Sequence, residues 1–294
     1  MKINQIEMFI LISQSGSIAE AARKLNKSRT TVSAALSAFE DELGVRLLDR
    51  TGNKVQLTDI GEAIANDCER LLMIASDIQT KCAQHLGGVE SSLRIARDDA
   101  LPESLWRQLV QQMSERFPGT SISIYVAPPP ELEQMVQQNI IDVAYSLLPD
   151  DHRIPQVHHH ELGQIHMMSV AHKDHPLSRL RKVNCSDLER YTEIALAYVD
   201  DESLKAATPR SSNFIALPFY EHLRDAVLDG SGWSYVPALL INKHLREGAI
   251  TVLKHNKAMN WQPYGEIVDS DTQRGAVIEW LSDQLESYLL EANR

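Results

Sequence analysis

Residues 16–44 of this chain read GSIAEAARKLNKSRTTVSAALSAFEDELG. Ser17, followed three positions later by Glu20, predicts a capping box that opens a short Ala-rich helix over residues 18–25. Ser28 predicts the N-cap of a second helix over residues 29–43. Apolar positions in that helix recur every three or four residues and form its expected buried face: Val32, Leu36, Phe39 and Leu43. Two helices joined by a short turn are typical of a helix-turn-helix unit, whose second helix enters a major groove.

The flanking sequence adds a helix on one side and a hairpin on the other. An apolar stripe starting at Ile6 predicts a helix that ends at Gly16. Residues 47–57 form two extended runs around a Thr-Gly-Asn-Lys turn, which predicts a small β-ribbon. A long helix is then expected from Thr58 to Leu86, because apolar residues recur along it with coiled-coil spacing. We interpret that stripe as a dimer seam.

The charge of the chain is unevenly distributed. The net charge is −11, yet residues 1–60 carry eight basic and seven acidic groups. Bulk charge therefore argues against a polycationic nucleic-acid binder, but no acidic residue lies between Arg23 and Phe39. This segment offers cations for phosphates and hydroxyl groups for base edges. The expected DNA-binding residues are Arg23, Lys27, Ser28, Arg29, Thr30, Thr31, Ser33, Ser37, Arg50 and Lys54.

Beyond residue 92 the pattern changes to alternating strands and helices. Strands are expected over 93–96, 121–126, 141–146, 165–171, 193–198 and 233–236, with helices between them. Such alternation favours parallel sheets covered by helices, arranged here as two α/β lobes. Ligands of these folds bind at the carboxyl ends of strands.

These segments together resemble the LysR-type transcriptional regulators over essentially the whole chain. The motifs that carry the resemblance are Ile6-Glu7-Met8-Phe9, residues 16–25, Ser28 with Val32-Ser33, residues 42–45, and Leu57-Thr58 with Gly61. Leu101-Pro102, Phe117-Pro118, residues 141–144 and Gly230-Ser231-Gly232 support it further.

The resemblance implies a winged helix-turn-helix, a dimerising linker helix, and a two-lobed α/β effector domain similar to periplasmic binding proteins. Such a regulator binds double-stranded promoter DNA and a small-molecule effector, and it pairs with itself as a homodimer that assembles into a homotetramer. It needs no cofactor and no metal. The domains expected on this basis are 1–58 for DNA binding, 59–88 for the linker helix, and 92–294 for the effector domain, with lobe I at about 92–163 and 265–294 and lobe II at about 164–264.

Two departures from the family pattern bear on function. Arg29 follows the capping Ser where family members often have Gln, and Ala34-Ala35 stands where they often have a basic residue and Gln or His, so some usual backbone contacts are missing. Arg29 fits either a bidentate contact to guanine or a phosphate contact.

The expected effector residues are unusually acidic: Arg97, Asp98, Asp99, Ala100, Pro129, Ser146, Val199, Asp200 and Asp201. Family members commonly have Ser or Thr in the first of these loops, where hydroxyl groups and backbone amides receive an anion. We therefore expect a neutral or cationic effector unless Arg97 or Arg210 compensates. The alternative is that Asp98, Asp99 and Asp201 merely cap the helices that follow them.

Other function classes are less well supported by the sequence. No nucleophile elbow, phosphate-binding glycine loop or zinc-binding His-Glu-x-x-His motif is present, which argues against an enzyme. The run His158-His159-His160 suggests a metal or pH sensor, but a polar strand edge is the simpler interpretation. Three cysteines, expected to be buried, and the lack of a signal peptide or transmembrane segment favour the cytoplasm.

Overall fold

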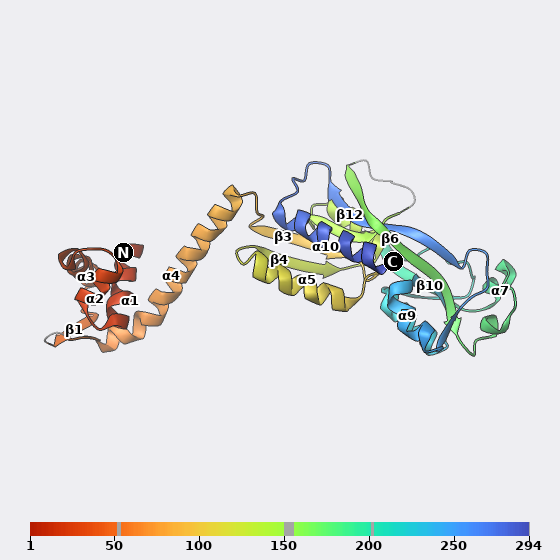
Figure 1. Ribbon diagram of the computed structural model, residues 1–294, viewed down its shortest axis with the longest axis horizontal. Coiled ribbons are helices and arrows are strands. Elements are labelled where there is room, and N and C mark those ends of the chain that lie inside the picture. Colours follow the sequence, from red (N-terminus) through yellow and green to blue (C-terminus); the bar gives the residue numbers. More distant parts are fainter. Residues whose placement is uncertain (52–53, 150–155, 201–202, 294) are drawn as a thin grey trace. The chain divides into compact units, whose positions relative to one another are not determined.

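The structure, a computed structural model, describes residues 1–51, 54–149, 156–200 and 203–293 (Figure 1). It divides into two compact units, Met1–Gly87 and Gly88–Arg294. The elements of the first unit are α1 (Ile3–Ser15), α2 (Ile18–Lys24), α3 (Arg29–Leu43), β1 (Leu48–Thr51), β2 (Lys54–Leu57) and α4 (Asp59–Leu86). No helix in the described ranges is long and apolar enough to cross a bilayer.

The first unit confirms the predicted helices and hairpin. Gly16 and Gly44 end α1 and α3 in the left-handed conformation, with φ of 63° and 71°. β1 and β2 pair antiparallel, as expected of a wing. The predicted capping box at Ser17 is wrong, because the Ser17 side chain makes no cap hydrogen bond. Leu43 is also 40% exposed and lies outside the predicted buried face.

One core holds the three short helices, the wing and the start of α4 together. Phe9 of α1 packs against Phe39 of α3 with ring centroids 6.0 Å apart. The other buried members include Ala21 and Ala22 of α2, whose small side chains allow the helices to approach closely. Cys68 of α4 joins this core, so α4 is anchored to the unit over its first turns.

The second unit is built on a mixed sheet. Its strands are β3 (Ser92–Arg97), β4 (Ser121–Val126), β5 (Val143–Leu147), β6 (Val157–His172), β7 (Glu193–Asp200), β8 (Ser203–Ala206), β9 (Phe214–Leu217), β10 (Trp233–Pro237), β11 (Ile250–Val252) and β12 (Met259–Asp269). Its helices are α5 (Glu103–Arg116), α6 (Pro129–Gln137), α7 (Cys185–Arg190), α8 (Tyr220–Leu228), α9 (Ala238–Arg246) and α10 (Ala276–Ala292), with a 3-10 turn at Pro176–Arg179.

Two long strands join the two halves of this sheet. The strand order is β4-β3-β5-β12-β6-β10-β7-β8, with β11 beside β6 and β9 beside β7. β3 is parallel to β4 and β5, and β7 is parallel to β9 and β10, as predicted. β6 and β12, however, pair antiparallel with each other and with their neighbours, so the expectation of purely parallel sheets is wrong. We call β3–β5, α5, α6 and α10 lobe I, and β7–β11 with α7–α9 lobe II.

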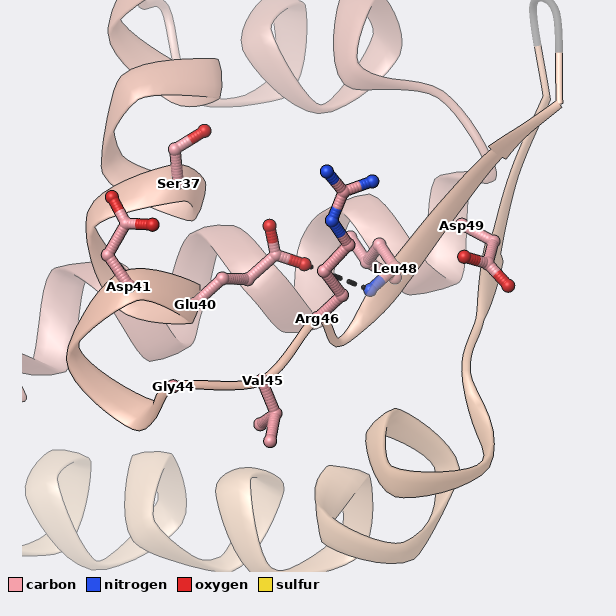
Figure 2. A pocket seen from close by; sticks show the side chains of 8 residues that line it. All are labelled: Ser37, Glu40, Asp41, Gly44, Val45, Arg46, Leu48 and Asp49. Carbon is pink, nitrogen blue, oxygen red and sulfur yellow. Dashed lines mark hydrogen bonds between the residues drawn. The ribbon is translucent and has the colours of Figure 1, made fainter.

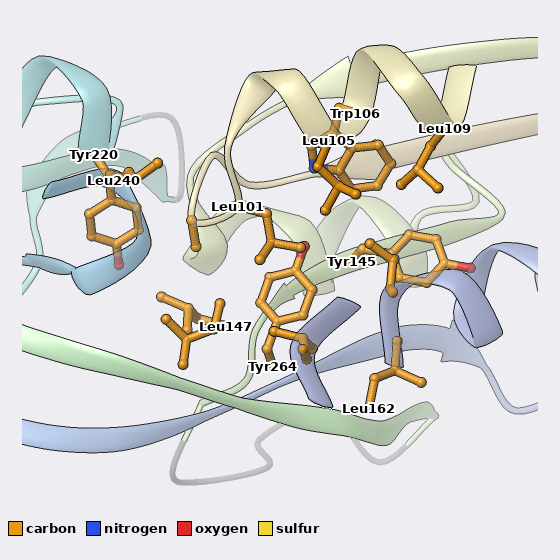
Figure 3. Close-up of a cluster of buried hydrophobic side chains, with 14 of the residues drawn as sticks. Leu101, Leu105, Trp106, Leu109, Tyr145, Leu147, Leu162, Tyr220, Leu240 and Tyr264 are labelled. Atoms are coloured by element: carbon orange, nitrogen blue, oxygen red, sulfur yellow. The ribbon is translucent and has the colours of Figure 1, made fainter. Parts of the chain in front are cut away.

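Helices cover both faces of lobe I. Neighbouring residues of β3 point to opposite faces: Ile95 belongs to the core under α5 and α10, and Ala96 to a second core under α6. The larger core continues into lobe II. Figure 3 shows Trp106 of α5, Leu147 of β5, Tyr264 of β12 and Tyr220 of α8 within this one cluster. The lobes therefore share a continuous apolar interior.

At Gly61, α4 packs tightly against Leu47, the residue that precedes β1. A Cβ atom at Gly61 would lie 2.1 Å from the carbonyl oxygen of Leu47. We expect Gly61→Ala to destabilise the first unit by about 1–3 kcal/mol, because backbone has to move to relieve the clash. Faster hydrogen exchange in peptides from residues 1–87 would report the loss. Glu62→Ala, on the next and exposed position, should leave exchange unchanged, and equal behaviour of the two variants would contradict the prediction.

Candidate nucleic-acid interface and effector site

The N-terminus of α3 presents a cluster of exposed polar side chains. Ser28 caps the helix, because its Oγ accepts a hydrogen bond of 3.1 Å from the backbone N–H of Thr31. The same Oγ lies 2.7 Å from the hydroxyl groups of Thr30 and Thr31. Arg29, at the first helical position, is exposed. The predicted cap is confirmed, and three contacts of Ser28 Oγ link the residues of the first turn of α3.

Cations surround this helix end. Arg23, Lys27 and Arg29 are all exposed, and within the described part of the chain none of them forms an ion pair. Their charges are therefore available to an external anion. Ser33 is half-buried further along α3. Arg50 lies in β1 and pairs with Val55, and Lys54 lies in β2 and pairs with Thr51. The side chains of Arg50 and Lys54 lie outside the described part of the structure.

Ser37 is separated from the cations and lines an acidic hollow. This open hollow of about 720 Å³ is also lined by Glu40, Asp41 and Asp49 (Figure 2). Glu40 has a structural role there, because its Oε1 accepts hydrogen bonds from the backbone N–H groups of Leu47 at 2.8 Å and Leu48 at 3.1 Å. These bonds fix the start of the wing against α3. Around this hollow Ser37 thus has three acidic neighbours and one basic neighbour, Arg46.

The apolar stripe of α4 is used in two ways. Ile64 and Cys68 pack into the core of the first unit. Further along the helix the apolar side chains are uncovered, with exposures of 43% to 88%: Leu71, Met73, Ile74, Ile78 and Leu86. The predicted seam is therefore an intramolecular contact at its start and an exposed apolar surface over its later turns.

In the second unit, Asp98 ties together the carboxyl ends of two strands. Its carboxylate is fully buried and accepts hydrogen bonds from the backbone N–H groups of Ala100 at 3.0 Å and Leu147 at 2.8 Å. The hydroxyl of Ser146 adds a third bond at 3.1 Å. Burial nevertheless outweighs these bonds and raises the pKa of Asp98 to about 7. Asp98 and Ser146 thus meet at the predicted strand ends, and Ala100 is buried beside them.

Asp99 reaches from lobe I to lobe II. Its Oδ2 accepts a hydrogen bond of 2.9 Å from the backbone N–H of Glu221, in the first turn of α8. The N-cap residue of α8, Phe219, has no side chain that can accept such a bond. Burial raises the pKa of Asp99. Asp99 therefore does cap a helix, but the capped helix is α8 rather than α5, which follows it in the sequence.

A second set of contacts joins the lobes at α6. Glu131 of α6 accepts a hydrogen bond of 2.8 Å from the backbone N–H of Val199 at the end of β7. Gln134 donates to Asp200 at 3.0 Å. Lys205 also pairs with Asp200 at 2.6 Å, and the hydrogen bond from Lys205 is the main reason that the pKa of Asp200 is lowered. Pro129 begins α6, while the predicted Asp201 lies outside the described residues.

The two arginines that were expected to balance these acids are engaged elsewhere. Arg97 is buried, pairs with Glu103 and lies over the ring of Trp106 at 4.9 Å. Arg210 is exposed and lies 5.7 Å from the ring centre of Tyr235. The site also contains residues absent from the prediction. Glu131 is one of these, and its place in the first turn of a predicted helix at a strand end is the signal that would have indicated it.

The histidine run and the cysteines show no second site. Within the described ranges, no group of three or more His, Cys, Asp and Glu side chains is placed to hold a metal ion. His159 bonds Glu133 at 2.5 Å. The expectation that all three cysteines are buried is wrong, because Cys82 and Cys185 are exposed and only Cys68 is buried.

Comparison with known families assigns both units. Residues 3–62 match the bacterial regulatory helix-turn-helix protein family of the LysR type, and residues 86–289 match the LysR substrate binding domain. Among curated proteins, the multiple virulence factor regulator of Pseudomonas aeruginosa is 29% identical over 255 residues, which covers 85% of this chain and 75% of that protein.

Solved structures show the same fold. A cysteine mutant of OxyR from Corynebacterium glutamicum matches with a TM-score of 0.66 and 21% identity, covering 99% of this chain and 94% of the other. CbnR, a LysR family transcriptional regulator, matches with a TM-score of 0.54 and 18% identity, covering 97% of this chain and all of the other.

The raised pKa of Asp98 predicts a pH-dependent stability. Folded Asp98 binds a proton up to about pH 7, whereas the unfolded chain loses it near 3.8. The Asp98 contribution to the free energy of unfolding should therefore be largest below pH 4 and fall by about 1.4 kcal/mol per unit between pH 4 and pH 7. All four tryptophans lie in residues 88–294, so their fluorescence during urea unfolding reports this unit alone.

Asp98→Asn removes the titrating group. The free energy of unfolding of this variant, relative to that of the wild type, should therefore increase as the pH is raised from 4 to 7. Asp225→Asn, at an exposed position on α8, provides the control and should track wild type. A wild-type to Asp98→Asn difference that stays constant with pH would contradict the assignment.

Proposed function

The chain belongs to the LysR family of bacterial transcriptional regulators, and we propose that the N-terminus of α3 reads the DNA. It is a DNA-binding regulator with an effector-binding domain, and its family comprises regulators rather than enzymes. The observation that carries the proposal is the cluster of exposed, unpaired cations around Arg29, in a stretch without acidic residues. Because the first unit is almost neutral overall, its attraction to DNA is local.

The proposed DNA contacts divide by position. Arg29 is placed to reach base edges in the major groove, because Arg29 is the first residue of α3, the helix that enters the groove. The remaining contacts are to phosphates and sugars, with the wing flanking the duplex and Ser37 at the acidic edge of the interface. The proposed set is Arg23, Lys27, Ser28, Arg29, Thr30, Thr31, Ser33, Ser37, Arg50 and Lys54.

We further propose that two chains pair through α4 and that two such dimers form a tetramer. The exposed apolar side chains on the later turns of α4 support the dimer, because contiguous apolar surface of this kind is buried by association. A twofold protein also suits operators built from two half-sites. Because the protein binds DNA, we propose that it is located in the bacterial cytoplasm.

The effector is proposed to bind between the lobes, close to the expected residues Arg97, Asp98, Asp99, Ala100, Pro129, Ser146, Val199, Asp200 and Asp201. Support comes from the position of these loops at strand ends and from the hydrogen bonds that cross between the lobes there. An effector that binds one arrangement of the lobes better than another shifts the population toward it and so couples to DNA binding.

The proposed domain limits are 1–58, 59–88 and 92–294. The division into compact units at Gly87 supports the second limit. Lobe I is taken as about 92–163 with 265–294, and lobe II as about 164–264. A shift in the β6–β12 register between Tyr264 and Gly265 supports a change of lobe at that point.

Arg29→Ala tests DNA recognition. We expect binding to the DNA upstream of the protein's own gene to weaken by about 1–3 kcal/mol, because a groove contact is lost. Gel shifts at one fixed salt concentration measure this change. Arg70→Ala removes the same charge from the exposed face of α4 and serves as the control. Unchanged affinity of Arg29→Ala would refute the groove contact, and an equal loss on random DNA would assign Arg29 to a phosphate.

Ile78→Asp tests the dimer. Ile78 is 58% exposed in the single chain. A charge at this position should prevent the helices from pairing, because an unpaired carboxylate in an apolar interface is poorly solvated. Sedimentation equilibrium should then show a lighter species than wild type. Asp77→Asn, on the neighbouring position, is the matched control, and an unchanged mass for Ile78→Asp would locate the dimer contact elsewhere.

A further inference from the structure

Two of the hydrogen bonds between the lobes have the same direction, whereas in a third Gln134 of lobe I donates to Asp200 of lobe II. Lobe I supplies the carboxylates of Asp99 and Glu131, and lobe II supplies backbone N–H groups from Glu221 and Val199. Backbone N–H groups at the N-terminus of a helix of nine residues such as α8 form a favourable site for an anion. In this chain the anion at that site is part of the protein.

The same site contains buried polar atoms without partners. Among the described residues, Oδ1 of Asp99 has no hydrogen-bond partner, although Asp99 is only 8% exposed. The hydroxyl of Tyr264 is fully buried and also unpartnered. Buried polar atoms are rarely left unsatisfied, and each one costs about 1–3 kcal/mol. Such a group of atoms is typical of a site that is completed by a ligand.

Tyr264 lies close to the loop that carries Asp99, because it faces Leu147 in the β5–β12 ladder and the Leu147 N–H donates to Asp98. Burial raises the pKa of Tyr264, and the charges of Asp98 and Asp99 add to that effect. They act in the same way on Tyr220, the first residue of α8. The free oxygen of Asp99 therefore belongs to a buried polar group at the junction of β12, α8 and the loop after β3.

Resting on the proposed function, we propose that Asp99 is a built-in ligand that occupies the anion site of α8, so that the effector is a neutral or cationic molecule bearing N–H or O–H groups. One such group donates to the free Oδ1 of Asp99, with the hydroxyl of Tyr264 as a second partner. A free carboxylate is excluded, because its place is taken and because the carboxylates of Asp99 and Glu131 would repel it.

The test uses the full-length protein, sodium acetate as a carboxylate probe and ethanolamine as a donor-bearing cation. Thermal unfolding of the second unit is followed by tryptophan fluorescence, against sodium chloride at equal ionic strength. Acetate should not shift the wild-type midpoint, whereas ethanolamine should raise it. Asp99→Ala should lower the midpoint by roughly 2–8 °C, because α8 loses its cap. Acetate should then restore the midpoint of this variant saturably, and ethanolamine should have no effect on it.

Two variants complete the design. Asp99→Asn keeps an acceptor at the helix end, so acetate should leave its midpoint unchanged even if Asp99→Ala folds poorly. Asp225→Ala removes an exposed carboxylate from the same helix and should behave as wild type with both probes. Stabilisation of the wild type by acetate, no rescue of a folded Asp99→Ala, or no effect of ethanolamine on the wild type would each overturn the inference. Gel shifts on the same proteins test DNA binding separately, so failure here is distinguishable from failure of the proposed function.

Discussion

The arrangement of the effector domain depends on one buried carboxylate. Asp98 accepts hydrogen bonds from backbone and hydroxyl groups at the ends of β3 and β5, and so fixes the loop between β3 and α5. Because that loop is fixed, Asp99 points toward lobe II and meets the first turn of α8. We therefore assign Asp98 a structural role, whereas the adjacent Asp99 carries the proposed ligand contact.

The DNA-binding unit shows a comparable separation along one helix. The N-terminal end of α3 carries exposed cations, while its C-terminal end carries Glu40, which holds the wing by accepting two backbone hydrogen bonds. Acidic residues are thus placed where they organise the protein and are missing where they would repel phosphate. An overall charge of −11 is compatible with DNA binding for this reason.

Local signals explain what could be predicted. Ser28 and the repeat of Val32, Leu36 and Phe39 define α3, since a cap and an apolar period are properties of neighbouring residues. The sequence analysis did not predict β12, because Pro263 and Gly265 are poor strand formers. Pairing with β6 compensates for their low strand propensity. The predicted effector loops include Asp99, yet its partner Glu221 is 122 positions away, and no spacing rule links residues so distant.

The two strands shared by the lobes restrict how an effector signal can travel. β6 and β12 run through both lobes, so any rotation of one lobe against the other must bend a hydrogen-bonded ribbon rather than swing on a loop. The ladder is already irregular between Tyr264 and Gly265, and bending costs least where regular pairing is broken. Tyr264 therefore lies at the irregular point of the ribbon and also faces Leu147, whose backbone N–H holds Asp98. In the proposed effector site, a ligand contact at Tyr264 would act directly on the part of the ribbon that bends most easily.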